Sequence, residues 1–236
     1  MLVIVASQWD HSAKALAKRW ADCGAGILTP RDLSVEGWRL RPGDWDDGAI
    51  VVDGKRVAQR EITGVLTRLP CATAQELIHI APEDRRYVAS EMTAFLLFWL
   101  SQLRCPVLNR PTAACLAGPF WRQEQWVHVA ATAGVPVQPV RRIVGVAASC
   151  AENTLELPPA VVTVVGKHTM GDGHRVLHRA ALRIAKLARA ELLSVSFSGP
   201  CPDAKFIGAG IFPDLGNEVV ADAVLDHLES AQAAHS

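Results

Sequence analysis

Apolar runs and amphipathic stretches alternate along the first part of the chain. Residues 2–7 (LVIVAS) form a continuous apolar run, which is typical of a strand buried on both faces of a parallel sheet. The next stretch places Ala13, Leu16 and Trp20 on one face of a helix, and a second apolar run ends at Pro30. A strand, a helix and a strand in this order predict a βαβ unit.

Three further features belong to the same part of the chain. Residues 49–58 (AIVVDGKRVA) carry the signal for a hairpin that turns at Asp53 and Gly54. Residues 64–70 (GVLTRLP) predict a buried strand with a polar end. A long helix is expected over residues 82–103, because a proline suits its first position and two acids suit the positive end of its dipole.

The rest of the chain alternates short apolar runs with amphipathic stretches. Helices are predicted over residues 112–118, 120–134, 175–190 and 217–232, strands over 160–166, 192–199 and 205–212, and a turn over 167–174. The last two strands are expected to be antiparallel neighbours. The pattern therefore predicts an open α/β domain up to about residue 110 and a mixed α+β domain after it.

The amino-acid composition limits the kinds of molecule that the protein is expected to bind. The 236 residues include 24 Lys and Arg against 24 Asp and Glu, so the chain lacks the basic surplus that binds nucleic acid or an acidic membrane surface. The most hydrophobic run, residues 92–100 (MTAFLLFWL), is far shorter than the roughly 20 residues that span a bilayer. No two of the six cysteines form a C-x-x-C pair, and the first residues lack a signal-peptide pattern. We therefore expect a cytoplasmic protein with reduced thiols.

Several weak motifs follow one another in a recognisable order. Residues 67–70 (TRLP) end a strand, Glu91 lies on the helix that follows, and Asn109 comes after the next apolar run. Near the end of the chain, residues 206–215 read FIGAGIFPDL. In this order the motifs resemble the ATP-grasp ligases, and most of all the subgroup that matures ribosomally made peptides by forming ester or amide links between side chains.

The resemblance implies a fold with two domains. Residues 1–110 would be a Rossmann-like pre-ATP-grasp domain, and residues 111–236 a truncated ATP-grasp α+β domain. The family's small β-rich lid subdomain should lie between the extended segment after residue 135 and the strand that begins near residue 160. Only residues 144–160 are available there, which is too short for a sheet that closes over a nucleotide. The lid is therefore expected to be missing.

The residues that hold metal and phosphate in the family are also replaced. The resemblance places Ser196, Gly208 and Gly210 where the family has its Asp, Glu and Asn metal ligands, and Val161 where it has an Arg. Mg²⁺ prefers hard oxygen ligands, and glycine has no side-chain oxygen. Because phosphoryl transfer depends on positioning and charge neutralisation, we expect no catalytic residue, no metal site and no cofactor.

Three positions that match the family remain candidates for substrate binding: Arg68, Glu91 and Asn109. Arg68 ends a parallel strand, where open α/β sheets bind ligands, and its guanidinium suits a carboxylate or a phosphate. Glu91 begins a heavily apolar helix face. It is either the salt-bridge partner of a buried arginine, with Arg68 as the candidate, or a substrate contact.

A second group of polar residues lies late in the chain. The glycine-rich stretch GKHTMGDGHR contains Lys167 and Asp172, and it is either a plain turn or a phosphate contact. His174 and His178 have metal-compatible spacing, although a surface or capping role is the simpler interpretation. Asp214 either shapes the turn before the final helix or binds a ligand.

Two functions from different classes fit these observations. The first is a non-catalytic accessory protein, a pseudoenzyme, which binds a peptide or a catalytic partner enzyme in a peptide-modification pathway. The second is an ATP-dependent carboxylate–amine or carboxylate–alcohol ligase in which Lys167, Asp172 and Asp214 replace the lost ligands, and which would need ATP and Mg²⁺. A small-molecule or nucleotide sensor is a third hypothesis. A homodimer is expected because the related maturases pair.

Overall fold

The computed structural model describes residues 1–41, 47–139 and 159–233. They form two compact units. The first consists of Met1–Phe120 together with Asp214–Ser236, and the second is Trp121–Pro213. This division differs from the predicted boundary near residue 110, because the closing helix returns to the first unit.

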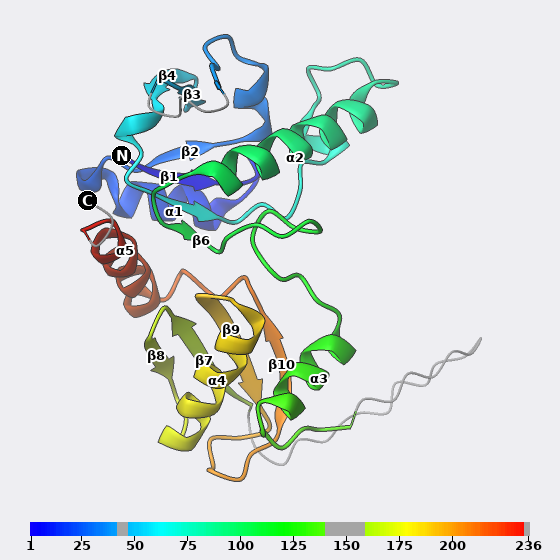
Figure 1. The fold of residues 1–236 in the computed structure, drawn as a ribbon, viewed down its shortest axis with the longest axis vertical. Helices are drawn as coiled ribbons and strands as arrows, with labels where there is room; N and C mark the ends of the chain where they lie inside the picture. The colour runs from blue at the N-terminus through cyan, green and yellow to red at the C-terminus, as the bar shows by residue number, and fades with distance from the viewer. Residues whose placement is uncertain (42–46, 140–158, 234–236) are drawn as a thin grey trace. The chain divides into compact units, whose positions relative to one another are not determined.

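A parallel sheet of four strands forms the centre of the first unit (Figure 1). Its strands are β1 (Leu2–Val5), β2 (Gly26–Leu28), β5 (Gly64–Thr67) and β6 (Val107–Leu108). Their order across the sheet is β2-β1-β5-β6, and each neighbouring pair runs parallel. The buried apolar strands that the sequence predicts are thus confirmed, together with the βαβ unit that opens the chain.

Three helices pack around this sheet. They are α1 (His11–Arg19), α2 (Arg85–Gln102) and α5 (Glu218–Ala233). The side chains of Trp99 and Leu100 on α2 share a buried cluster with Val3 and Val65. Leu228 on α5 lies against Gly64, where an added Cβ would come within 3.4 Å of it. This packing explains why the first unit includes the final helix.

The predicted hairpin lies beside the parallel sheet. Strands β3 (Ala49–Val52) and β4 (Lys55–Ala58) pair antiparallel. The turn residues Asp53 and Gly54 have φ values of 50° and 69°, the left-handed conformation that a tight two-residue hairpin turn requires. The Asp-Gly signal is therefore confirmed.

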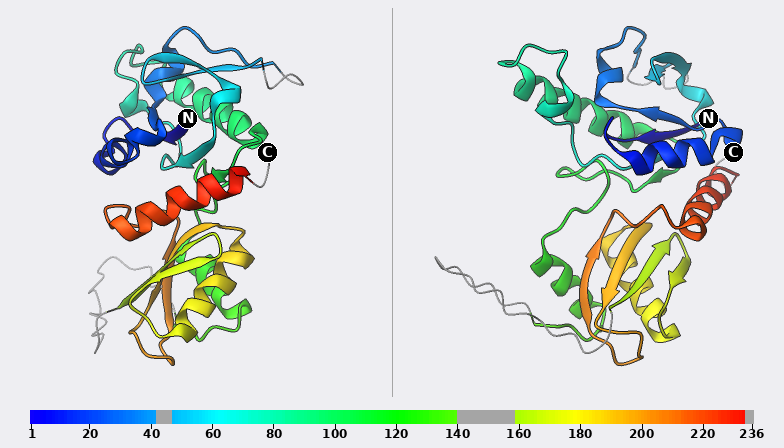
Figure 2. Two further views of the ribbon diagram at one scale, coloured as in Figure 1. Left: turned by 90° about the vertical axis from the view of Figure 1, so that its left-hand side faces the viewer. Right: turned by 180° about the vertical axis from the view of Figure 1, so that it is seen from behind.

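The second unit contains an antiparallel sheet of order β10-β9-β7-β8. The strands are β7 (Ala160–Val165), β8 (His168–Gly171), β9 (Leu192–Phe197) and β10 (Phe206–Gly210). Helices α3 (Gln123–Thr132) and α4 (Arg175–Ala188) lie on one side of this sheet (Figure 2). The predicted antiparallel pairing of the last two strands is confirmed.

Short elements complete the described chain. Four 3₁₀ helices are Ala21–Cys23, Pro30–Ser34, Gln59–Glu61 and Ala74–Glu76. None of the described helices is both long and apolar enough to cross a membrane.

Two predicted elements are wrong. Residues 112–118 form turns rather than a helix, because their backbone groups bond within a Thr112–Cys115 bridge and to Pro70 instead. Residues 168–171 form strand β8 rather than part of a turn, because they complete the ladder with β7 and leave only a tight turn at Gly166, whose φ is 58°. Most of the interval in which the lid is expected to be missing lies outside the described residues.

Candidate functional site

The carboxyl edge of the parallel sheet is the first candidate site. β1 is flanked by β2 on one side and β5 on the other, so the chain reverses its direction of winding between β1 and β5. Loops that leave two such strands diverge, and the crevice between them is where open α/β sheets bind ligands. Arg68 directly follows β5, as the sequence predicts, and Asp10 lies in the loop after β1.

An ion pair joins these two loops. Arg68 Nε donates a hydrogen bond to Asp10 Oδ2 at 2.8 Å, and the two side chains are only 14% and 17% exposed. Asp10 also caps α1, since its Oδ1 accepts a bond from the Ala13 N–H at 2.9 Å. Burial acts to raise the pKa of Asp10, but the bonds from Arg68 and from the backbone of Ala13 and Ser12 prevail and hold that pKa below its usual value.

The predicted partner of Arg68 is therefore wrong. Glu91 is exposed on α2, and it forms no ion pair with any residue that the structure describes. The physical reason is the sheet order: the end of β1 adjoins the end of β5, so Asp10 reaches Arg68. Sequence reasoning missed Asp10, although an aspartate three residues before a helical alanine is a typical N-cap signal.

Asn109 is buried at the end of β6. Its Nδ2 donates a hydrogen bond to the Ala117 carbonyl at 3.2 Å. Gly118 has a φ of 106°, and a Cβ added there would lie 2.7 Å from the Asn109 Cβ. The amide thus supports the backbone of the segment that follows β6, and its role in substrate binding stays a prediction.

Other polar groups lie near the same edge. The side-chain oxygens Thr67 Oγ1 and Glu76 Oε1 are buried and have no hydrogen-bond partner within the described parts of the chain. Gln8, in the loop after β1, donates a hydrogen bond from Nε2 to the Glu76 carbonyl at 3.2 Å. The loops after β1 and β5 are therefore linked both by the ion pair and through Glu76.

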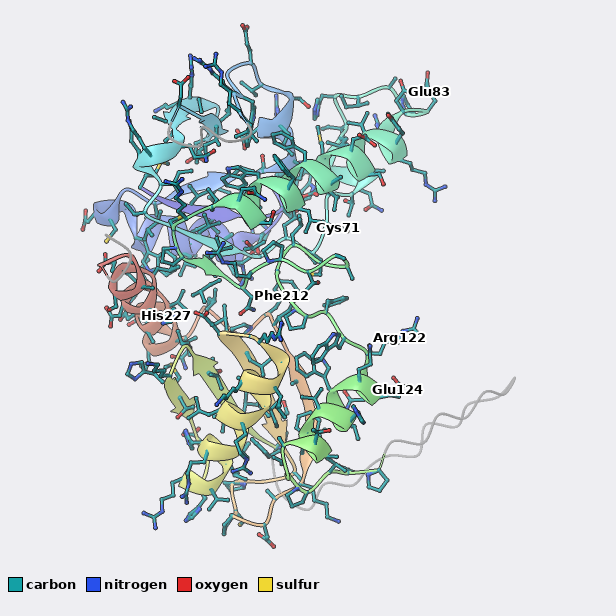
Figure 3. The ribbon with its side chains drawn as sticks, viewed as in Figure 1. Cys71, Glu83, Arg122, Glu124, Phe212 and His227 are labelled. Atoms are coloured by element: carbon teal, nitrogen blue, oxygen red, sulfur yellow. The ribbon has the colours of Figure 1, made fainter. Side chains whose placement is uncertain are left out.

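An open hollow of about 670 Å³ lies between the segment after β5 and helix α2. Cys71, labelled in Figure 3, lines it from the loop. Arg86, Ser90 and Thr93 line it from the helix, with several alanines around them. The lining of this hollow therefore combines a cation, hydroxyl groups and small apolar residues.

The second candidate site is a row of residues across the antiparallel sheet. Val161 on β7 pairs with Ser196 on β9, and Ser196 pairs in turn with Gly208 on β10. Gly210 lies two residues further and pairs with Ser194. The register thus brings together the four positions that the resemblance assigns to metal and phosphate binding.

The side chains in this row do not suit a magnesium site. Ser196 contributes one hydroxyl, Val161 is a 44% exposed aliphatic residue, and both glycines lack a side chain. The space beside Gly208 adjoins the Gln123 side chain, whose Oε1 is 3.3 Å from an added Cβ. Gln123 Nε2 itself donates to the Ile207 carbonyl. Mg²⁺ prefers several hard oxygen ligands, so this residue set does not fit the metal that the fold family implies.

Of the residues proposed as replacement ligands, Asp172 lies beside that row, because Gly171 pairs with Val162 and the next residue of the antiparallel pair adjoins Val161. Lys167 is exposed in the turn between β7 and β8, and Asp172 is exposed after the far end of β8. The four residues of β8 lie between them, so their Cα atoms are about 16 Å apart along the strand. Asp214 is exposed in the other unit, where its Oδ1 accepts a bond from the Gly216 N–H at 2.8 Å and shapes a turn.

The two histidines with metal-compatible spacing have other contacts. His174 is the N-cap of α4, and its Nδ1 accepts a bond from the Val176 N–H at 3.3 Å. The His178 ring bonds to the Thr169 hydroxyl at 2.9 Å. No group of three His, Cys, Asp or Glu residues within the described part of the chain could hold a metal ion.

No protein-family model and no curated protein sequence matches the chain. Solved structures do match it over nearly its whole length. The macrocyclase MdnC from Microcystis aeruginosa MRC, bound with the precursor peptide MdnA, has a TM-score of 0.68 at 12% identity, with 96% of this chain and 98% of that chain covered. A RiPP-associated ATP-grasp ligase from Chryseobacterium gregarium, in complex with ADP and a leader and core peptide, has a TM-score of 0.66 at 10% identity, with 96% of each chain covered.

The ATP-grasp ligase PsnB, complexed with a phosphomimetic variant of its minimal precursor, Mg and ADP, has a TM-score of 0.66 at 14% identity, with 98% of each chain covered. At such identities the likeness establishes the fold. The resemblance to ATP-grasp peptide maturases is therefore confirmed at the level of the mixed α/β fold.

Proposed function

We propose that the protein is a non-catalytic, ATP-grasp-like accessory protein which binds a peptide or a partner enzyme in a peptide-modification pathway. The observation that carries this proposal is the row of Val161, Ser196 and Gly208, with Gly210 beside it. Strand pairing aligns these positions, with a register irregularity between Phe206 and Gly208, while the row offers a single hydroxyl as a hard oxygen ligand and no cation. Phosphoryl transfer is accelerated mainly by groups that position the phosphates and neutralise their charge. Because this row lacks the neutralising groups, we expect little or no phosphoryl transfer.

The binding part of the proposal rests on the first unit. Two of the proteins with similar structures, MdnC and PsnB, have structures in complex with precursor peptides. In this chain, the hollow beside α2 and the Arg68–Asp10 pair lie near the carboxyl edge of the parallel sheet. We assign a peptide or partner segment to this region, with Arg68 and Arg86 as the cations that attract its acidic groups.

The proposal extends to the architecture. The first unit would be a Rossmann-like pre-ATP-grasp domain, and the second a remnant of the ATP-grasp domain without its lid. A ligase with substituted ligands would need Lys167, Asp172 and Asp214 to act on one nucleotide. The separation of Lys167 and Asp172 along β8 counts against that alternative.

The decisive experiment is calorimetric titration of the protein with ATP, with and without Mg²⁺. We expect no Mg²⁺-dependent binding tighter than the millimolar range. The matched variant carries Val161→Arg, Ser196→Asp, Gly208→Glu and Gly210→Asn, which together restore the family's arginine and its three metal ligands, and it should gain Mg²⁺-dependent affinity. Tight, Mg²⁺-dependent binding to the unmodified chain, or ATP-dependent ligation by it alone, would overturn the proposal.

A further inference from the structure

A small hollow lies at the amino edge of the parallel sheet, opposite the edge described above. Strands β5 and β6 are parallel neighbours, with Val65 paired to Val107, so the segments that lead into them lie side by side. This amino-edge hollow has a volume of about 180 Å³, and all of it belongs to the first unit. Its lining consists of Gln59, Arg60, Ile62, Gln102, Leu103, Arg104 and Cys105.

Two arginines at the amino-edge hollow lack an anionic partner. Arg60 lies before β5 and Arg104 lies before β6, and both are exposed. Neither side chain forms a hydrogen bond or an ion pair with any residue that the structure describes. A third arginine, Arg110, donates from Nη1 to the Leu103 carbonyl at 2.9 Å and from Nη2 to the Cys105 carbonyl at 3.3 Å. Three arginines therefore border the hollow.

Gln59 adds a buried polar side chain to the lining. It is only 7% exposed, and within the described parts of the chain its amide forms no hydrogen bond. Its Oε1 is enclosed beside Gly48, where an added Cβ would come within 2.9 Å of it. The amide nitrogen is therefore the end that remains available to the hollow, and its N–H groups can donate to an anion.

The described residues that line the amino-edge hollow include no aspartate or glutamate. Glu61 follows Arg60 in the sequence but lies outside this lining. Cys105 contributes a thiol, and burial raises the pKa of that thiol to about 11, although the charge of Arg110 acts to lower it. The thiol is therefore uncharged at neutral pH, and it does not compete with an anion for the arginines.

We propose that the amino-edge hollow binds a phosphate group, as the free ion or as a monoester, with Arg60, Arg104 and Gln59 as its hydrogen-bond donors. Guanidinium groups present pairs of N–H donors that match phosphate oxygens. A phosphate monoester carries a charge of about −1.5 to −2 at pH 7, which two unpaired arginines match better than they match the single charge of a carboxylate.

The size of the amino-edge hollow agrees with such a ligand. A water molecule occupies about 30 Å³ in the liquid. A hollow of about 180 Å³ therefore has room for a phosphate group and neighbouring water molecules. The hollow lies at the opposite edge of the sheet from the region to which we assign a peptide, so this proposal holds whether or not the protein binds peptides or is catalytic.

Alkylation of Cys105 reports whether the amino-edge hollow is occupied, because its thiol lies in the lining. The folded chain is treated with N-ethylmaleimide in inorganic phosphate, methyl phosphate, acetate or chloride at equal ionic strength, and peptide mass spectrometry gives the rate at each cysteine. We expect one or both phosphates to slow alkylation of Cys105 by about threefold or more. The exposed Cys23 and Cys201 should react at an unchanged rate.

The two phosphates also distinguish the source of the ligand. Protection by inorganic phosphate alone would identify the free ion, and protection by methyl phosphate alone would identify a monoester. Absence of protection by both, or equal protection by acetate, would overturn the proposal.

The arginines are tested by calorimetric titration with the same two phosphates. One variant carries Arg60→Gln and Arg104→Gln, and the matched control carries Arg175→Gln and Arg179→Gln, two exposed arginines of the second unit. Both variants lose the same charge. Because the first loses the charge-assisted hydrogen bonds to the anion, we expect its affinity to fall by about tenfold or more, while the control binds as the unmodified chain does. Equal losses in the two variants would contradict a specific site.

Gln59→Leu tests the buried amide. Leucine removes both the N–H donors and the enclosed oxygen that lacks a partner, so the fold should be retained, and thermal unfolding followed by circular dichroism checks this for every variant. We expect the affinity for phosphate to fall by about threefold to tenfold with both arginines in place. Unchanged affinity in this variant would overturn the assignment of Gln59 as a donor.

Discussion

The edge of the parallel sheet and the row across the antiparallel sheet are both places where neighbouring strands bring residues far apart in the sequence side by side. At the first, Arg68 and Asp10 meet at 2.8 Å between adjacent strand ends. At the second, strand pairing places Val161, Ser196 and Gly208 next to one another, yet none of these three residues has a charged side chain. The backbone supplies the position in both, and only the side chains decide what each position can do.

Among the variants that test this comparison, we expect Asp10→Ala to cause the largest loss of stability. The substitution removes the cap of α1 and leaves the mostly buried Arg68 guanidinium without its ion-pair partner. A lost cap and a lost charge-assisted bond together should reduce the free energy of unfolding by about 2 to 3 kcal/mol. Urea unfolding monitored by circular dichroism measures the loss.

The matched variant is Asp10→Asn, which keeps a capping oxygen but not the charge. We expect it to lose only about 1 kcal/mol, since the cap remains and the charge-assisted part of the bond is removed. If both variants were as stable as the unmodified chain, the ion pair would contribute nothing to the stability of the first unit.

A smaller effect should appear in how the free energy of unfolding depends on pH. The folded-state pKa of Asp10 lies below the value of 3.8 of an unperturbed aspartate. The stability that the Asp10 carboxylate contributes is therefore fully present above pH 3.8 and is lost as the pH falls through the lower, folded-state pKa. The difference in unfolding free energy between the unmodified chain and Asp10→Asn should shrink from pH 6 to pH 3, and a constant difference would contradict this origin.

The smallest effects are expected in the second unit. Ser196→Ala and Val161→Arg should each change the unfolding free energy by less than about 0.5 kcal/mol, because neither side chain has a described hydrogen-bond or ion-pair partner. Addition of Mg²⁺ should leave the melting temperature of the unmodified chain unchanged. A loss above 1.5 kcal/mol, or stabilisation by Mg²⁺, would mean that the row still holds a ligand.

Local signals in the sequence predict much of this fold. The continuous apolar runs mark β1 and β5, the Asp53-Gly54 pair marks the hairpin, and the amphipathic pattern marks α4. Each of these depends on residues close together in the chain, where apolar periodicity and turn chemistry act directly.

The features that the sequence did not predict depend on which elements become neighbours in the folded chain. The partner of Arg68 follows from the order of strands in the sheet, which the pattern of one strand does not contain. Strand β8 has little apolar pattern of its own and is a strand because β7 offers it a ladder. The segment 112–118 has good helix formers, but it is too short to nucleate a helix without tertiary support.

The return of α5 to the first unit affects the order in which the chain can fold. The sheet face at Gly64 is covered by Leu228, a residue more than 160 positions later. During synthesis the ribosome must release the whole second unit before this face can be buried. Until then an apolar surface of the first unit stays open to water, so a chain stalled before residue 218 should bind chaperones that recognise exposed apolar segments.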